Sequence, residues 1–443
     1  MNKHISSLRF DDALPAFIRY LIDAQIDVYS GVVLRDGFGR LAFYSRSSIS
    51  RISTHQRNLQ KLLGKYTFPA GAIQYAGTVG ESILHDPTAL PYQVHVDGKA
   101  HQILVVDRRF YGRDWLVTPS KPIVGMPPLM TFGSIKGGVG RTTALFVLAM
   151  HLARQGKNVL LIDLDLEAPG LASLVFEGDE RPKYGVLDYL VENALNGVSD
   201  ADLTNFVGTS VLTDREVGHG RVDLAPATGT ATLDSPVNML SKLARALIED
   251  PVSDGPPKSL ADQTRELVQR LAKSSAYDVV LVDARAGLAE LTAGPLLGLG
   301  GVVALFGTDH PHTFEGYRYL TAHLSLLPLP DEVDDWRERI RFVHAKSSAS
   351  SDMRSQFDDR LYELLSETFY EEDEGDDVFT FSLKDEAAPH RAWRIFFDSQ
   401  FLDVDPIRDR SVLESDVYKA AFGSFLDSAC DALGLKVRGG NDE

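Results

Sequence analysis

The chain has 443 residues, long enough for two or three domains, and its 44% hydrophobic and 24% charged residues are ordinary for a globular protein. No stretch of the sequence is long and apolar enough to span a membrane, and residues 1–15 lack the apolar core of a signal peptide. Cys430 is the only cysteine, which excludes an intramolecular disulfide. We therefore expect a cytoplasmic protein that makes no membrane contact.

Charge is distributed unevenly along the chain. The formal net charge is −17, which argues against a general nucleic-acid coat protein. Residues 1–128 hold 15 Lys and Arg against 10 Asp and Glu, a balance of +5, so the remainder carries −22. Such an asymmetry indicates a partner, or the docking of one domain on another.

Residues 1–120 have the pattern of a separate α+β domain. Helical periodicity over 14–26 is followed by two strands within 30–45 and by a loop and helix over 48–65. A hairpin is predicted over 92–109, because Asp-Gly stands at its turn. Residues 121–128 are rich in proline and are expected to form a linker. These patterns do not indicate what the domain does.

Basic residues of the N-terminal domain gather between positions 46 and 65. Arg46, Arg51, Arg57, Lys61 and Lys65 occur there without any acidic residue. A solvated helix face, or docking on the acidic remainder of the chain, is the favoured interpretation. A nucleic acid is the alternative partner for this segment.

From residue 129 the pattern changes to apolar strands that alternate with helices. Apolar runs predict buried strands at 129–135, 158–166, 277–285 and 300–308, and more weakly at 339–346. Such strands, with helices between them, are typical of a parallel sheet covered on both faces. After about residue 350 the chain is predicted to be acidic and mostly helical, with a last helix near 412–434.

The segment GSIKGGVGRTT (133–143) has the composition and context of a phosphate-binding loop. It follows a predicted strand and opens a predicted helix over 142–156, as such a loop must. Its glycines let the backbone curl so that N–H groups point at a phosphate, and the helix N-terminus adds its positive end. Thr142 is placed to offer its hydroxyl to Mg²⁺. The alternative is a glycine-rich turn that binds nothing.

Three further elements follow in the order that a nucleotide site requires. In DLDLEAPG (163–170), Asp163 and Asp165 stand where a strand end opens into the ligand crevice. In VLVDARAG (280–287), Asp283 ends an apolar strand as a Walker B aspartate does, and Gly287 has the spacing of a phosphate-sensing switch. The next strand lies in GVVALFGTD (301–309). Together these elements predict a P-loop NTPase fold, an α/β three-layer sandwich with a mostly parallel sheet.

On these motifs, the segment from about 129 to 346 resembles the deviant Walker A ATPases, the ParA/MinD-like group of the SIMIBI class. The sequence is more closely similar to the variants with a KGGVGR motif. The resemblance implies an ATPase domain over 129–443 with an acidic helical C-terminal part, and it does not extend to residues 1–128. It also implies ATP and Mg²⁺ as cofactors, a homodimer bridged by ATP, and at least one partner protein.

Roles for individual residues follow from the same resemblance. Lys136 corresponds to the lysine that reaches the phosphates of the partner subunit, Asp165 to the carboxylate that positions the attacking water, and Asp163 to a carboxylate near the metal. Thr142 and Asp283 correspond to the magnesium-binding residues. The residues expected to contact nucleotide are Gly137, Gly138, Val139, Gly140, Arg141, Thr142, Thr143 and Gly287.

Arg141 departs from the family pattern, which has a lysine at this position. Arginine keeps the charge, but its planar fork is bulkier and prefers bidentate contacts. Three outcomes stay open: hydrolysis persists slowly, ATP binds and drives dimerisation with almost no turnover, or nucleotide binding is lost. The intact Lys136, Asp163 and Asp165 argue against the third.

The function expected from these features is an ATP-binding, Mg²⁺-dependent dimerisation switch with slow hydrolysis that acts with partner proteins. A place in a bacterial multi-protein conflict or defence system rests on association alone. The alternatives are a non-hydrolysing nucleotide-bound scaffold and an ATPase that partitions DNA or another cargo; the balance of −22 argues against the last. A preference for adenine over guanine is taken from the resemblance.

Overall fold

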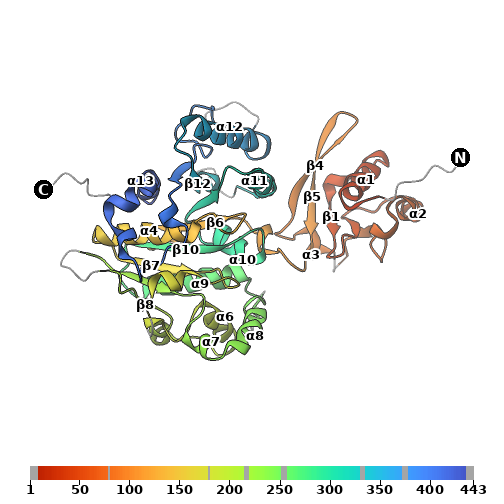
Figure 1. The fold of residues 1–443 in the computed structure, drawn as a ribbon. Coiled ribbons are helices and arrows are strands. Elements are labelled where there is room, and N and C mark those ends of the chain that lie inside the picture. The colour runs from red at the N-terminus through yellow and green to blue at the C-terminus, as the bar shows by residue number, and fades with distance from the viewer. Residues whose placement is uncertain are drawn as a thin grey trace. The chain divides into compact units, whose positions relative to one another are not determined.

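The computed structural model describes residues 8–77, 80–177, 180–213, 219–250, 257–329, 335–371 and 378–435. The chain divides into two compact units (Figure 1). We call Met1–Val117 with Leu326–Pro328 the N-terminal unit, and Thr118–Ser325 with Leu329–Glu443 the P-loop unit. No helix in the described part of the chain is long and apolar enough to cross a bilayer.

The N-terminal unit is built on a five-stranded mixed sheet with the order β3-β2-β1-β5-β4. Its main core contains apolar side chains of α1, such as Phe17 and Leu21, and of α2, such as Leu59. Asp97 and Gly98, at the turn of the predicted hairpin, both have positive φ, +49° and +76°, as a tight two-residue turn requires. The elements are α1 (Phe10–Asp23), β1 (Gly31–Arg35), β2 (Leu41–Ser45), α2 (Ile52–Leu63), β3 (Ile73–Tyr75), α3 (Glu81–Leu84), β4 (Leu90–Val96) and β5 (Lys99–Asp107).

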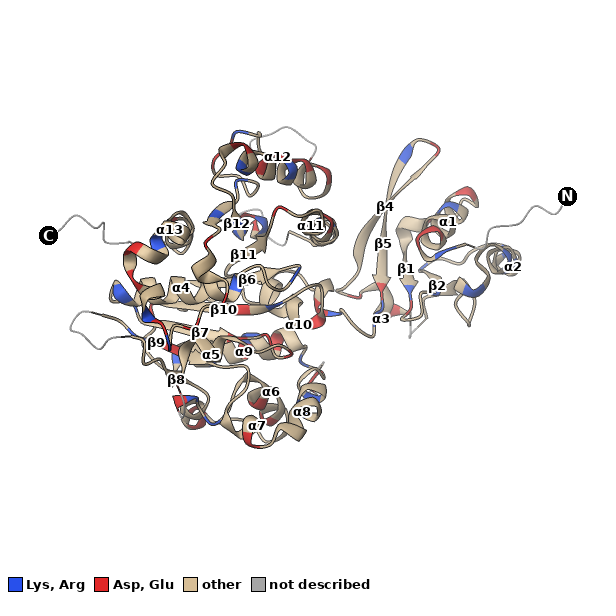
Figure 2. Cartoon of the chain, in the orientation of Figure 1, with Lys and Arg blue, Asp and Glu red and all other residues tan. Residues whose placement is uncertain are grey.

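The basic segment 46–65 lies on the surface of this unit and includes α2 (Figure 2). Arg46, Arg51, Arg57, Lys61 and Lys65 are all exposed. Helix α2 buries its opposite face, so the arrangement is that of an amphipathic helix with a charged outer side.

The P-loop unit contains an eight-stranded sheet with the order β13-β12-β11-β6-β10-β7-β9-β8. Every neighbouring pair is parallel except β8 and β9. The strands are β6 (Leu129–Ser134), β7 (Val159–Asp163), β8 (Gly208–Thr209), β9 (Val222–Ala225), β10 (Val279–Ala286), β11 (Val302–Gly307), β12 (Ile340–Ser347) and β13 (Trp393–Phe396). The predicted α/β class with a mostly parallel sheet is confirmed.

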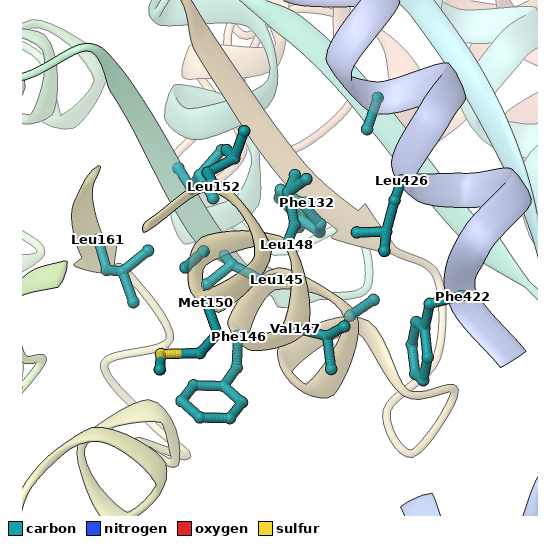
Figure 3. Packing of buried hydrophobic residues seen from close by; sticks show 14 of the residues in the cluster. Phe132, Leu145, Phe146, Val147, Leu148, Met150, Leu152, Leu161, Phe422 and Leu426 are labelled. Carbon is teal, nitrogen blue, oxygen red and sulfur yellow. The ribbon is translucent and has the colours of Figure 1, made fainter. Parts of the chain in front are cut away.

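Helices cover both faces of this sheet because its central strands are apolar on both sides. Apolar side chains of α4 and α13, such as Leu148 and Leu426, pack on one face together with Phe132 of β6 (Figure 3). Side chains of α6 and α9, such as Leu187 and Leu267, pack on the other face. The helices are α4 (Arg141–Arg154), α5 (Leu171–Val175), α6 (Val186–Leu195), α7 (Thr230–Asp234), α8 (Met239–Ala246), α9 (Leu260–Lys273), α10 (Glu290–Ala293), α11 (Pro311–Leu324), α12 (Ser351–Thr368) and α13 (Ser415–Ala432).

Two features of the P-loop unit differ from the expected pattern. The C-terminal part is mostly helical, as expected, but it also contains the short strand β13. This strand lies between α12 and α13 in sequence and forms one edge of the sheet. The segment expected as a linker, 121–128, also belongs to this unit, where Arg265 Nη2 donates to the Lys121 carbonyl at 3.1 Å. The proposed domain boundaries stay a prediction.

Candidate nucleotide-binding site

The loop between β6 and α4 leaves open space around its glycines. Gly138 and Gly140 have φ of +76° and +93°, in the left-handed region that favours glycine. A Cβ added at Gly137, Gly138 or Gly140 would meet nothing within 4 Å. The loop borders a hollow of about 210 Å³, lined by residues 137–143 together with Ser134, Lys346, Phe401 and Leu402. Every loop residue predicted to contact nucleotide therefore lines this hollow.

The predicted acidic residues meet at the carboxyl ends of adjacent strands. Strand β10 lies between β6 and β7, and Asp283 of β10 is the register partner of Asp163 of β7. The register of β10 against β6 shifts after Asp283, between Asp283 and Ala286. The Leu164 N–H donates to the Asp283 carbonyl at 2.9 Å, which ties the two strand ends together. The parallel sheet thus brings side chains 120 positions apart in sequence to one edge.

Arg141 does not point away from these carboxylates but lies buried among them. Its Nε donates to Asp283 Oδ1 at 2.5 Å, its Nη2 to Asp165 Oδ2 at 3.1 Å, and its Nη1 to Ser134 Oγ at 3.2 Å. Only 8% of the residue is exposed. Burial opposes its charged form, but the carboxylates outweigh burial and raise the pKa of Arg141 further. The guanidinium forms ion pairs with two carboxylates of this acidic site, Asp165 and Asp283.

Thr142 completes the contact between the loop and β10. Its Oγ1 donates to Asp283 Oδ2 at 2.6 Å, so both oxygens of Asp283 accept hydrogen bonds from the first turn of α4. Asp283 is only 2% exposed. Burial raises its pKa, and the bonds from Arg141 and Thr142 oppose that shift.

Asp163 is the least satisfied carboxylate of the site. Its Oδ1 accepts from the Asp165 backbone N–H at 3.0 Å, while Oδ2 has no hydrogen-bond partner within the described residues. Complete burial, followed by the charge of Asp283, raises the pKa of Asp163 above its ordinary range. A buried oxygen of this kind can accept a further donor or contact a cation.

Lys136 and Gly287 lie at the rim of the site in different situations. Lys136 is exposed, and within the described part of the chain no ion pair joins it to Asp163, Asp165 or Asp283. Gly287 has a φ of +96°, and its N–H donates to the Ser134 carbonyl at 2.8 Å. Gly287 was expected to contact nucleotide, and in this structure its N–H is bonded to the last residue of β6.

Two contributors to the site were not among the predicted residues. Lys346, at the end of β12, donates from Nζ to the Gly138 carbonyl at 2.8 Å and lines the hollow. Ser134, at the end of β6, accepts from Arg141 and donates to the Lys136 carbonyl at 3.0 Å. Both stand at carboxyl ends of parallel strands, which is the signal that could have found them.

Comparison with known proteins shows what the segment around this site is similar to. Residues 130–301 match the CobQ/CobB/MinD/ParA nucleotide binding domain. The chain contains a ParA/MinD-like nucleotide-binding domain. The matched segment begins in β6 and includes the loop, both acidic strand ends and Gly287.

Several proteins of this kind are similar to the chain over part of its length. The chromosome-partitioning ATPase Soj of Thermus thermophilus is 28% identical over 189 residues, which cover 43% of this chain and 58% of that protein. Protein virC1 of Rhizobium radiobacter is 33% identical over 160 residues, which cover 32% of this chain and 64% of that protein. The iron-sulfur cluster carrier protein of Salmonella typhimurium is 26% identical over 185 residues, covering 40% and 47%. The chain spans about half to two thirds of these relatives.

Among solved structures, a ParA family ATPase from Chlorobium tepidum has a TM-score of 0.43 and 18% identity, covering 68% of this chain and 98% of that one. The septum site-determining protein MinD from Pyrococcus horikoshii, complexed with Mg-ADP, has a TM-score of 0.42 and 16% identity. The match covers 71% of this chain and 100% of that one.

The residues of this site fit a magnesium nucleotide. The open glycine loop at the start of α4 suits phosphate groups, because backbone N–H groups and the helix N-terminus both favour anions. Thr142 and Asp283 supply the hydroxyl and carboxylate oxygens that Mg²⁺ prefers, and the unpartnered Asp163 Oδ2 lies next to Asp283 in register. Arg141 competes with a metal for Asp283, because its Nε already donates to Asp283 Oδ1.

Proposed function

We propose that the chain is an ATP- and Mg²⁺-binding dimerisation switch with slow hydrolysis. The observation that carries this proposal is the hydrogen-bonded set of Arg141, Thr142, Asp165 and Asp283 beneath an open glycine loop. A glycine-rich turn without a ligand would have no need for acidic residues buried at the ends of two neighbouring strands. Mg²⁺, when bound with ATP, would stabilise the negative charge that develops during phosphoryl transfer.

The chain's own residues would divide the work as follows. The loop backbone over Gly137–Thr143 would hold the phosphates, and Thr142 with Asp283 would hold the metal. Asp165 would orient the attacking water once released from Arg141. Lys136, being exposed, would reach the phosphates bound by a second copy, so that each subunit completes the other's site.

The dimerisation step can be tested by multi-angle light scattering of the full chain without nucleotide, with ADP and Mg²⁺, and with ATP and Mg²⁺. We expect a doubled mass only with ATP. Lys136→Ala should bind ATP but remain monomeric, whereas Lys273→Ala, which removes another exposed lysine of the same unit, should dimerise normally. An Lys136→Ala protein that dimerises like the wild type would refute the cross-subunit role.

A non-hydrolysing scaffold is the second candidate, and the contacts of Arg141 favour it. The 3.1 Å contact of Arg141 with Asp165 occupies the carboxylate assigned to water activation. ATP would then be held without turnover. Release of phosphate at a rate no higher than that of Asp165→Ala, together with tight ATP binding, would select the scaffold over the switch.

We also propose that the chain acts with at least one partner protein, by analogy with the ATPases that it resembles. One relative, Soj, is named a chromosome-partitioning ATPase. The exposed basic residues 46–65 are the surface on which a nucleic acid would be sought, although the remainder of the chain carries −22 and would repel it. A retardation assay with double-stranded DNA, with and without ATP, tests this alternative.

A further inference from the structure

A second polar pocket follows the β13 edge of the large sheet. Its volume is about 800 Å³, within the range of small-molecule sites. Its walls come from the first two turns of α12, from the segment that leads into β13, and from one side of α13. None of its lining residues also lines the hollow at the phosphate loop. The pocket is therefore separate from the nucleotide site.

The pocket concentrates arginine in an acidic protein. Four arginines and three acidic residues line it, although the chain has a net charge of −17. The arginines are Arg341, Arg354, Arg391 and Arg394. This local excess of positive charge runs against the composition of the whole chain and favours an anionic ligand.

Two of the arginines are neutralised by carboxylates of the pocket. Arg394 Nη2 donates to Asp358 Oδ2, and Arg391 Nη1 lies 3.6 Å from the same oxygen. Arg391 also pairs with Glu386 at 2.5 Å. The side chain of Asp358 is only 7% exposed, so it acts as a fixed anchor for both guanidinium groups.

The other two arginines have only backbone carbonyls as acceptors within the described residues. Arg341 Nη1 donates to the carbonyls of Glu338 and Ile340, at 2.5 and 2.9 Å. Arg354 Nη1 donates to the carbonyls of Ser348 and Ala349, at 3.1 and 2.6 Å.

No carboxylate of the described residues pairs with Arg341 or Arg354. Burial lowers the pKa of Arg341 despite the nearby Glu338, as expected for a guanidinium without a paired counter-charge. Each fork keeps N–H donors for an oxyanion.

A third observation concerns the kind of anion. Asp358 Oδ1 is buried and has no hydrogen-bond partner among the described residues. The carboxylate of Asp358 therefore bonds the arginines through Oδ2 alone, and its other oxygen is covered by protein. Ser351 and Ser355, on the first turns of the 18-residue helix α12, add hydroxyls beside the positive end of that helix.

We propose that this pocket binds a phosphorylated small molecule, with Arg341 and Arg354 as the residues that recognise its phosphate. Asp358 holds the neighbouring Arg391 and Arg394 in place. The pocket shares β12 with the nucleotide site, since Arg341 stands near the start of this strand and Lys346, at its end, contacts the phosphate loop.

The test is calorimetric titration of pyrophosphate into the full chain with ADP and Mg²⁺ at saturation, so that the phosphate loop is engaged. We expect one pyrophosphate site in the wild-type protein. Arg341→Gln and Arg354→Gln should each weaken binding by at least tenfold. Arg408→Gln, which removes an arginine whose side chain is 87% exposed outside the pocket, should bind as the wild type does.

A wild-type protein that binds no pyrophosphate, or pocket variants that bind it as tightly as Arg408→Gln, would overturn the proposal. Hydrogen exchange of the wild-type protein gives a readout that does not depend on the variants folding. Pyrophosphate should slow exchange in peptides that cover 351–358 and 391–394. Protection confined to 133–143 would place the ligand at the phosphate loop and also overturn the proposal.

Discussion

Replacing Arg141 with lysine tests whether this residue holds the nucleotide-free site together. The substitution keeps the positive charge and restores the residue type of the family's loop. A lysine ammonium is a single point of charge, whereas the guanidinium reaches Asp283, Asp165 and Ser134 through three different nitrogens. The variant can therefore keep an ion pair with one carboxylate but not the whole arrangement.

The expected loss follows from those contacts. A hydrogen bond to a charged partner contributes about 1.5–3 kcal/mol, and a neutral one about 1 kcal/mol. If lysine keeps the bond to Asp283, it loses the charged bond to Asp165 and the bond to Ser134. Relaxation and water entry offset part of this, so we expect the free energy of unfolding to fall by about 2 kcal/mol.

The measurement is urea unfolding of the nucleotide-free protein, followed through the transition of the P-loop unit. Arg408→Lys is the matched control, because Arg408 pairs with Asp405 on the surface at 3.3 Å and should change stability by less than about 0.5 kcal/mol. Equal midpoints for Arg141→Lys and Arg408→Lys would refute the view that Arg141 stabilises the empty site. Turnover should rise in Arg141→Lys if arginine restrains hydrolysis, and a fall would mean that the site is adapted to arginine.

Three further predictions concern single contacts. Thr142→Val removes the 2.6 Å bond to Asp283 and should abolish the dependence of ATP affinity on Mg²⁺, while Thr142→Ser preserves it; titrations with Mg²⁺ and with EDTA decide. Asp165→Ala should prolong the lifetime of the ATP-bound dimer, and an unchanged lifetime would remove Asp165 from the mechanism. Burial lowers the pKa of His151 to about 4, so the folded protein favours the neutral imidazole. The free energy of unfolding should therefore fall by up to roughly 3 kcal/mol as pH falls from about 6.5 to 4. His151→Gln should flatten the plot of unfolding free energy against pH in that window, and an unchanged slope would contradict the assignment.

The fold of the P-loop unit was predictable where strands are apolar throughout. Strands β6, β7, β10 and β11 each contain an apolar run that is followed by a glycine or an aspartate, namely Gly133, Asp163, Asp283 and Gly307, and this local signal can be read without any tertiary information. Strand β9 has four residues and β13 has the mixed sequence Trp393–Phe396 at the sheet edge. Their pairing depends on neighbours distant in sequence, so a local pattern could not reveal them.

The composition of the site was predictable, but the placement of its charges was not. The motif order indicated Asp163, Asp165, Thr142 and Asp283, and the structure brings all four to one edge of the sheet. The sequence gives no reason for Arg141 to turn towards carboxylates rather than towards a phosphate. The direction of the Arg141 side chain depends on β6, β10 and β7 being neighbours in the sheet, which brings several carboxylates together. A buried carboxylate is costly unless a cation lies beside it, so the guanidinium turns towards them.

The contacts of Arg141 link stability to nucleotide affinity. Asp283 Oδ1 accepts from Arg141 and Oδ2 from Thr142, so a metal bound at Oδ1 would share that oxygen with the positive charge of the guanidinium. The guanidinium also holds Asp165, the carboxylate assigned to the attacking water. On the proposed function, the bonds that stabilise the nucleotide-free site would therefore oppose both metal binding and hydrolysis. Substitutions at position 141 should therefore change the stability of the nucleotide-free protein and the affinity for nucleotide in opposite directions. Variants that unfold more easily without nucleotide should gain more stability from ATP and Mg²⁺, because less of the binding energy is used to move the side chain.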